Sequence, residues 1–134
     1  MKKITSSATV GILLLGTIIL FTNCSKEDEP VVPAFTVSST TVPLQSGGDG
    51  LQFKARCTNN DVKMTEVLIT GPAQAQAYTY PLNDQGFSKN QDFDLQDASV
   101  AYGKLTGTWT FIFVGKRTSD NESFTVSASL SVSK

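Results

Sequence analysis

A two-residue alternation near the C-terminus is the feature that most constrains the fold of this chain. The apolar members of this alternation are Phe124, Val126, Ala128, Leu130 and Val132. Each residue between them carries a hydroxyl group: Thr125, Ser127, Ser129 and Ser131. Successive side chains of a β-strand point to opposite faces, so the pattern predicts a strand with one core face and one solvent face. Helical periodicity is absent after residue 33, which favours an all-β fold.

The same alternation predicts most of the other strands. Leu51 begins a run to Cys57 in which apolar and polar residues take turns, and residues 35–44 and 62–70 are further predicted strands. Trp109, Phe111 and Phe113 share one face of a strand whose other face is also apolar, which predicts a central position in its sheet.

The middle of the chain is predicted to be less regular. Residues 74–82 are expected to form a short edge strand that ends at Pro81, because proline cannot donate to a sheet ladder. Residues 83–86 read Asn-Asp-Gln-Gly and predict a turn, and residues 87–95 alternate only weakly.

Roughly seven strands in about 100 residues are typical of a β-sandwich, with a small antiparallel barrel as the alternative. Residues 107–111, followed by Gly115 and a polar hairpin, resemble the last hairpin of bacterial immunoglobulin-like domains. Tyr102 lies where such domains often carry a corner tyrosine. The resemblance implies an immunoglobulin-like β-sandwich over residues 34–134.

The N-terminus has the parts of a secretory signal peptide. Lys2 and Lys3 supply the positive charge, and the apolar run over residues 8–21 contains no charged residue. This run is shorter than the roughly 20 apolar residues that span a bilayer core. A cleaved signal over residues 1–23 is therefore predicted, with a simple signal peptide or a membrane anchor as the alternative to a lipoprotein signal.

Cys24 closes this segment, and Phe21-Thr22-Asn23-Cys24 resembles the lipobox of bacterial lipoproteins. The resemblance implies that Cys24 is lipidated, becomes the mature N-terminus and anchors the protein in a membrane. Residues 24–33 are then expected to form a flexible tether.

Lys26, Glu27 and Asp28 resemble the export signal of surface lipoproteins of the Bacteroidota. The resemblance implies an outer-membrane lipoprotein of the bacterial cell envelope, exposed at the cell surface. The alternative is that these three residues are only a solvated part of the tether.

The composition disfavours several kinds of function. The sequence has no histidine, which removes His-dependent triads and most zinc sites. Its formal net charge is −1 and its basic residues are scattered, so no nucleic-acid partner is expected. Cys57 alternates with Phe53 and Ala55, which predicts a buried and unreactive thiol. We expect no catalytic residues, no metal and no cofactor.

Asp92 and Asp94 are the best carboxylate pair. On a strand they would share a face about 6.5–7 Å apart, a separation that also suits paired-carboxylate hydrolysis. Two solvated side chains give the same pattern, and this interpretation is favoured. With Asp84 and Asp97 they are also a candidate calcium site, although the glycine-turned loop of a known calcium motif is missing.

Tyr78 and Tyr80 are the candidate ligand-binding residues. They share a face of the predicted edge strand, where exposed rings can stack on sugars while the Gln74 and Gln76 amides bond hydroxyl groups. The alternative is ordinary packing at the rim of a sheet, and Trp109 is expected in the core.

The sequence therefore predicts a membrane-anchored, non-catalytic binding or interaction module of the accessory or adhesion type, with a protein partner. A surface glycan-binding lipoprotein that uses Tyr78 and Tyr80 is the alternative. A small hydrolase that uses Asp92 and Asp94 comes last.

Overall fold

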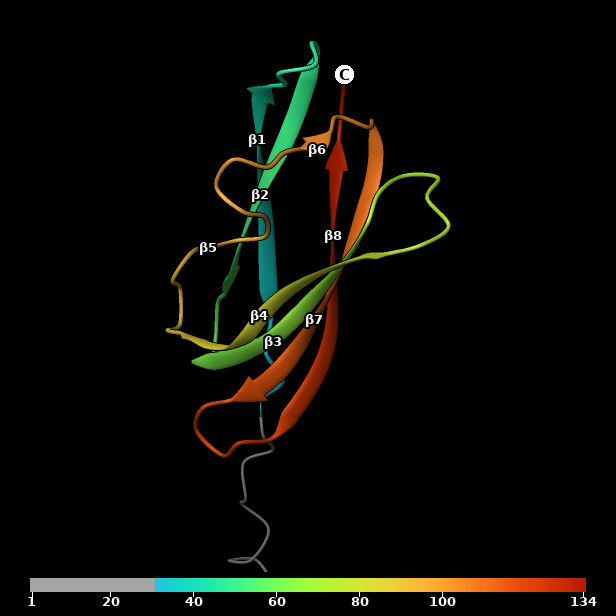
Figure 1. The fold of residues 1–134 in the computed structure, drawn as a ribbon. Coiled ribbons are helices and arrows are strands. Elements are labelled where there is room, and N and C mark those ends of the chain that lie inside the picture. Colours follow the sequence, from blue (N-terminus) through green and yellow to red (C-terminus); the bar gives the residue numbers. More distant parts are fainter. Residues whose placement is uncertain (1–30) are drawn as a thin grey trace, which may run out of the picture. The chain divides into compact units, whose positions relative to one another are not determined.

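The computed structural model describes residues 31–134, which form an all-β sandwich of eight strands in two antiparallel sheets (Figure 1). The predicted signal peptide over residues 1–23, the lipidated Cys24 and the export signal Lys26, Glu27 and Asp28 lie outside the described residues. Within residues 31–134, no helix has the length and apolar character needed to cross a membrane.

The strands follow one another along the chain with short connections. Their bounds are β1 Phe35–Pro43, β2 Asp49–Cys57, β3 Val62–Thr70, β4 Tyr78–Phe87, β5 Phe93–Asp94, β6 Tyr102–Gly103, β7 Gly107–Arg117 and β8 Ser123–Val132.

One sheet has the order β1-β2-β5, with the short β6 also paired to β2, and the other has the order β4-β3-β7-β8. The chain crosses between the sheets after β2, after β4 and again before β7. This is the strand order of an immunoglobulin-like sandwich, in which the third strand starts the second sheet. Two separate sheets exclude the small barrel, and β7 lies between β3 and β8 as its apolar faces predicted.

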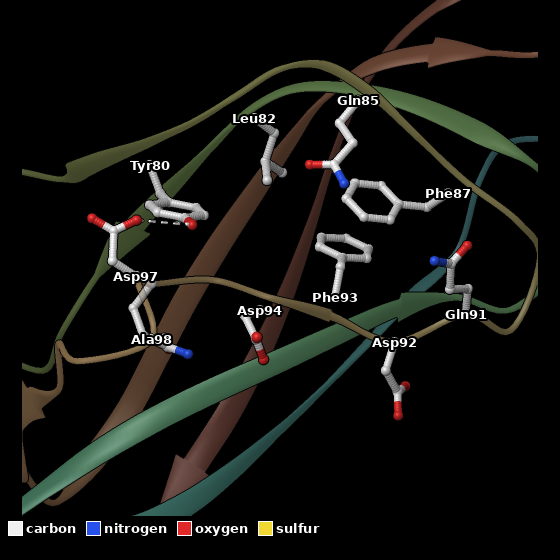
Figure 2. A pocket seen from close by; sticks show the side chains of 11 residues that line it. Tyr80, Leu82, Gln85, Phe87, Gln91, Asp92, Phe93, Asp94, Asp97 and Ala98 are labelled. Atoms are coloured by element: carbon white, nitrogen blue, oxygen red, sulfur yellow. Dashed lines mark hydrogen bonds between the residues drawn. The ribbon is translucent and has the colours of Figure 1, made fainter.

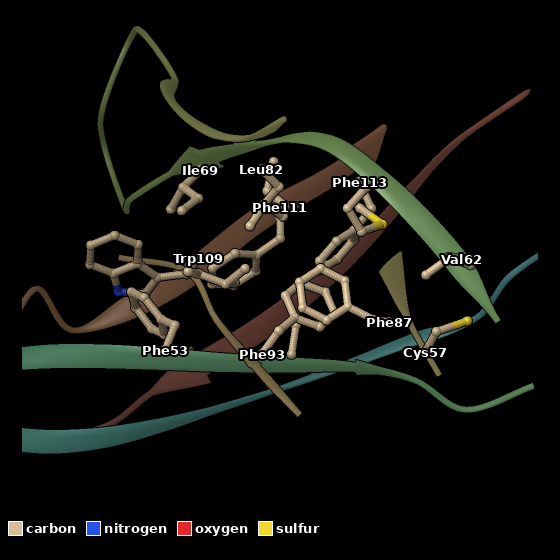
Figure 3. Close-up of a cluster of buried hydrophobic side chains, with 14 of the residues drawn as sticks. Phe53, Cys57, Val62, Ile69, Leu82, Phe87, Phe93, Trp109, Phe111 and Phe113 are labelled. Atoms are coloured by element: carbon tan, nitrogen blue, oxygen red, sulfur yellow. The ribbon is translucent and has the colours of Figure 1, made fainter. Parts of the chain in front are cut away.

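The core lies between the sheets and is rich in aromatic rings (Figure 3). Phe53 of β2 packs against Trp109 and Phe111 of β7, with ring centroids 4.9 and 5.0 Å apart. Trp109 is buried, as predicted, and Cys57 is a buried free thiol. The alternating residues of β8 also point as predicted, with their apolar side chains packed against the core.

The edge strand β4 differs from the prediction. Residues 74–77 precede it without belonging to a strand, and it continues through Pro81, which is in register with Glu66 of β3. The predicted strand end at Pro81 is wrong because an edge strand has one side without a neighbour, where a proline costs no ladder hydrogen bond.

The turn predicted at residues 83–86 is a β-bulge within β4. Asn83 and Asp84 have φ values of 52° and 61°, and the register between β3 and β4 shifts between Met64 and Glu66. The Thr65 hydroxyl donates a hydrogen bond of 3.0 Å to Asp84 Oδ1. Asparagine and aspartate tolerate this left-handed backbone, so bulge and turn share one sequence signal.

The weakly alternating segment at residues 87–95 contains only a two-residue strand, β5. A side chain extends its attachment to β2, because Gln96 Oε1 accepts a 2.7 Å hydrogen bond from the Phe53 backbone N–H. The Leu95 backbone N–H donates to the Phe53 carbonyl oxygen at 3.1 Å. The segment thus lies along β2 with little regular ladder.

The folded unit that the structure describes spans Val31–Lys134. Arg117 Nη1 donates to the Val31 carbonyl oxygen at 3.0 Å, and Asn59 Nδ2 donates to that of Val32 at 3.0 Å. Pro33 is buried. We call this end of the sandwich, with the turn at 58–61 and the hairpin at 118–122, the base. The opposite end, with the connections at 44–48, 71–77 and 104–106, is the tip.

Candidate functional site

Exposed apolar side chains gather in one pocket at the tip. Tyr78, Val100 and Leu105 are 55%, 45% and 41% exposed, and all three line a pocket of about 460 Å³. Among residues 31–134, the other large hydrophobic side chains that are exposed are Val31 and Val32 at the base. The full lining of this tip pocket is Ile69, Gln74, Tyr78, Val100, Tyr102, Gly103, Leu105 and Trp109.

Three aromatic rings from three strands form a continuous row in the tip pocket. The Tyr78 and Tyr102 rings meet edge to face with centroids 5.8 Å apart, and Tyr102 meets Trp109 in the same way at 6.0 Å. Tyr102 donates its hydroxyl proton to the Leu95 carbonyl oxygen at 2.8 Å, and Trp109 Nε1 donates to that of Leu105 at 3.0 Å. These two rings therefore use their polar atoms internally and offer the pocket mainly apolar surface.

The loop between β3 and β4 closes one wall of the tip pocket. Gln74 Oε1 accepts a 2.8 Å hydrogen bond from the Gly71 backbone N–H, which fixes the Gln74 side chain. A Cβ atom at Gly71 would lie 2.6 Å from Gln74 Oε1 and 3.2 Å from Trp109 Cη2, so a larger residue at position 71 would displace the Gln74 amide from this wall.

Tyr80 lies two residues beyond Tyr78 on the same side of β4, as predicted, but it lines a different pocket. This side pocket has a volume of about 410 Å³ and lies between β4 and the segment that contains β5 (Figure 2). Tyr80 is half-buried, and its hydroxyl donates a long hydrogen bond of 3.4 Å to Asp97 Oδ1. Burial, followed by the charge of Asp97, raises the Tyr80 pKa. The two tyrosines thus do not form one shared platform.

Both members of the predicted carboxylate pair face cations of β2. Arg56 Nε lies 2.6 Å from Asp92 Oδ1, and Lys54 Nζ lies 3.8 Å from Asp94 Oδ1. The hydrogen bond from Arg56 lowers the pKa of Asp92. A general acid in paired-carboxylate hydrolysis needs a raised pKa, so this arrangement disfavours the hydrolase alternative.

The candidate calcium ligands do not assemble into a metal site. Across residues 31–134, no three of the cysteine, aspartate and glutamate side chains are grouped so that they could hold a metal ion. Asp84 instead accepts a hydrogen bond from Thr65, and Asp97 accepts one from Tyr80.

No known family model, curated protein or solved structure matches this chain.

The structure adds pocket residues that the sequence did not reveal. Val100 and Leu105 line the tip pocket and Gln96 lines the side pocket, yet all three lie in segments without a clear period. The available signal was the presence of Val100 and Leu105 as large apolar residues in irregular segments, where polar residues are the norm.

Proposed function

We propose that this protein is a non-catalytic binding module of the bacterial cell envelope, anchored through acyl chains on Cys24, which engages a protein partner through its tip pocket. The observation that carries this proposal is the gathering of exposed Tyr78, Val100 and Leu105 around one concave surface. Exposed apolar patches of this kind mark interaction sites in soluble domains.

The chemistry of the tip pocket favours an apolar or aromatic side chain as the occupant. Its described lining contains no charged residue, and its polar groups are mainly the Gln74 amide and the Tyr78 hydroxyl. Its volume lies within the roughly 300–1,000 Å³ of ligand pockets. Rigid aromatic walls with a few polar groups are typical of the centre of a protein interface, where a partner inserts an anchor residue.

The position of the pocket also supports a surface role. The chain enters the folded unit at Val31 in the base, and β1 runs from base to tip over roughly 27 Å. Residues 24–30 between the proposed anchor and Val31 can extend by up to about 23 Å. An anchored domain would then present its tip pocket to partners beyond the membrane.

Site-specific photo-crosslinking in cells tests this proposal with the full-length chain. A photo-reactive amino acid at Val100 should crosslink to one discrete protein, whereas the same group at Thr40, exposed on β1, should not. Tyr78→Ala should reduce the Val100 crosslink about fivefold to thirtyfold, as expected for loss of an interface tyrosine. Equal crosslinking from both positions, or a yield that Tyr78→Ala leaves unchanged, would contradict the proposal.

A further inference from the structure

The side pocket combines amides, carboxylates and aromatic rings, a chemistry different from that of the tip pocket (Figure 2). It lies along the flank of the sandwich, where the short β5 leaves much of the space beside β4 uncovered. Its polar lining includes three glutamines and three aspartates, which are Gln85, Gln91, Gln96, Asp92, Asp94 and Asp97.

Gln96 is the most informative of these residues because it is only 5% exposed. Its Oε1 accepts the 2.7 Å hydrogen bond from the Phe53 backbone, which fixes the orientation of the amide. Its Nε2 makes no hydrogen bond within residues 31–134. In this part of the chain, no side-chain nitrogen or oxygen is both fully buried and without a hydrogen-bond partner, so Nε2 must be accessible to solvent. The Nε2 atom therefore reaches the pocket space and presents donors there.

Gln91 repeats this arrangement at the rim. Its Oε1 accepts a 2.9 Å hydrogen bond from the Ser88 backbone N–H, so the Nε2 group is the end that can donate to a ligand. Asp97 supplies acceptor oxygens on the other side, next to the Tyr80 hydroxyl. Donors and acceptors thus surround one cavity, as a ligand with several hydroxyl groups requires.

The floor of the side pocket is apolar and aromatic. Phe87 and Phe93 stack with ring centroids 4.2 Å apart and planes 21° from parallel, and Figure 2 shows the two rings facing each other. Tyr80 adds a half-buried ring to one wall. The two phenylalanine rings are buried and cover each other, so the half-buried Tyr80 ring is the flat surface that the C–H face of a sugar ring can contact.

The charges of the side pocket favour a neutral ligand. Arg56 pairs with Asp92 and Lys54 pairs with Asp94, so two of the three carboxylates are balanced by cations of β2. No metal-holding group of side chains occurs among the described residues. A cation would gain little from a surface that already supplies its own counterions.

We propose that the side pocket is a binding site for a neutral saccharide. One sugar ring packs against Tyr80, its hydroxyl groups accept hydrogen bonds from the amides of Gln91 and Gln96, and another hydroxyl group donates to the Asp97 carboxylate. This site is separate from the tip pocket and does not depend on the protein partner proposed for it.

The test is calorimetric titration of the purified full-length protein with neutral oligosaccharides built from glucose, mannose, galactose or xylose. We expect at least one of them to bind with a dissociation constant below about 10 mM. Tyr80→Ala should weaken this binding about tenfold through loss of the ring contact. Gln91→Glu keeps an acceptor for the Ser88 N–H but removes the donor, and should weaken binding about fivefold.

Tyr78→Ala is the matched control, because it removes the same side chain from the same strand but alters the tip pocket. It should leave saccharide affinity within about twofold. Absence of binding by all four neutral series, tighter binding of an oligouronate, or an affinity that Tyr80→Ala leaves unchanged would each overturn the proposal. Equal loss with Tyr78→Ala would also overturn it, by moving the sugar to the tip. Crosslinking from Val100 is measured separately in cells and does not depend on Tyr80 or Gln91, so the saccharide proposal can fail while the partner proposal stands.

Discussion

At the scale of single residues, Tyr102 connects the fold to both pockets. Its ring packs against Phe53 in the core at 5.5 Å and against Tyr78 in the tip pocket at 5.8 Å. Its hydroxyl reaches seven residues back to the Leu95 carbonyl, as a corner tyrosine does. This hydrogen bond closes the segment that carries Gln96 to one pocket and Val100 to the other.

Removing only this hydroxyl should destabilise the fold. Tyr102→Phe keeps the ring contacts but leaves the Leu95 carbonyl without its partner, and should lower the free energy of unfolding by about 1–2 kcal/mol. Urea denaturation followed by tryptophan fluorescence measures this change. Tyr78→Phe is the control and should change stability by less than about 0.5 kcal/mol, because the Tyr78 side chain is largely exposed. Equal effects of the two variants would show that the Tyr102 hydrogen bond is not stabilising.

The same variant should also change the response to alkali. Burial, followed by the neighbouring Tyr78 hydroxyl, raises the Tyr102 pKa well above its ordinary value. As the pH rises, the unfolded chain therefore loses this proton first, near pH 10. The contribution of the Tyr102 hydroxyl to the free energy of unfolding is complete below that pH and declines as the pH rises further. The stability difference between the wild type and Tyr102→Phe should narrow above about pH 10. A stability difference that stays constant from pH 7 upward would contradict a raised Tyr102 pKa in the folded protein.

At the scale of secondary-structure elements, the close approach of β3 and β7 depends on one glycine. Gly115 of β7 is in register with Met64, where the pairing of β3 with β7 shifts around Thr65. A Cβ atom at Gly115 would collide with the Lys63 carbonyl oxygen and lie 3.1 Å from Phe124 Cζ. Because a backbone oxygen cannot turn aside as a side chain can, β3 and β7 approach this closely only with glycine at position 115.

Gly115→Ala should therefore lower the free energy of unfolding by about 1–3 kcal/mol through overpacking. Gly86→Ala is a matched control in β4 of the same sheet, since a Cβ atom there meets nothing within 4 Å. The control should be neutral or slightly stabilising, because alanine restricts the unfolded chain more than glycine does. Urea denaturation of both variants checks the prediction, and it fails if Gly86→Ala is the more damaging change.

The elements also show which parts of the fold the sequence could predict. The strands at residues 51–57, 62–70 and 124–132 were predicted almost to the residue, because each buries one face and must alternate. The strand β4 was predicted less well because its bulge uses the residues of a turn. The location of Gln96 in a pocket could not be predicted, since it depends on a side-chain contact with β2 from 43 residues away.

At the scale of the whole folded unit, the two pockets and the chain entry occupy different regions. Val31 enters at the base, where Arg117 holds its carbonyl oxygen, while the tip pocket lies at the opposite ends of β3 and β7. The side pocket lies between these ends along β4. A domain anchored near its base, as proposed, would leave both pockets accessible to partners.

Cysteine labelling on intact cells tests this orientation and the proposed location together. Leu105→Cys places a thiol at the exposed rim of the tip pocket, and a membrane-impermeant maleimide should label it without permeabilising the cells. The wild type is the control and should remain unlabelled, because Cys57 is buried and the proposed acylation occupies Cys24. Labelling of Leu105→Cys only after the outer membrane is opened would place the protein on the periplasmic side.

Adding Cys24→Ser to Leu105→Cys should leave an unprocessed precursor without an acyl label, because the anchoring residue is gone. Processing of that double variant to the normal mature mass would contradict lipidation at Cys24, whatever the labelling at position 105.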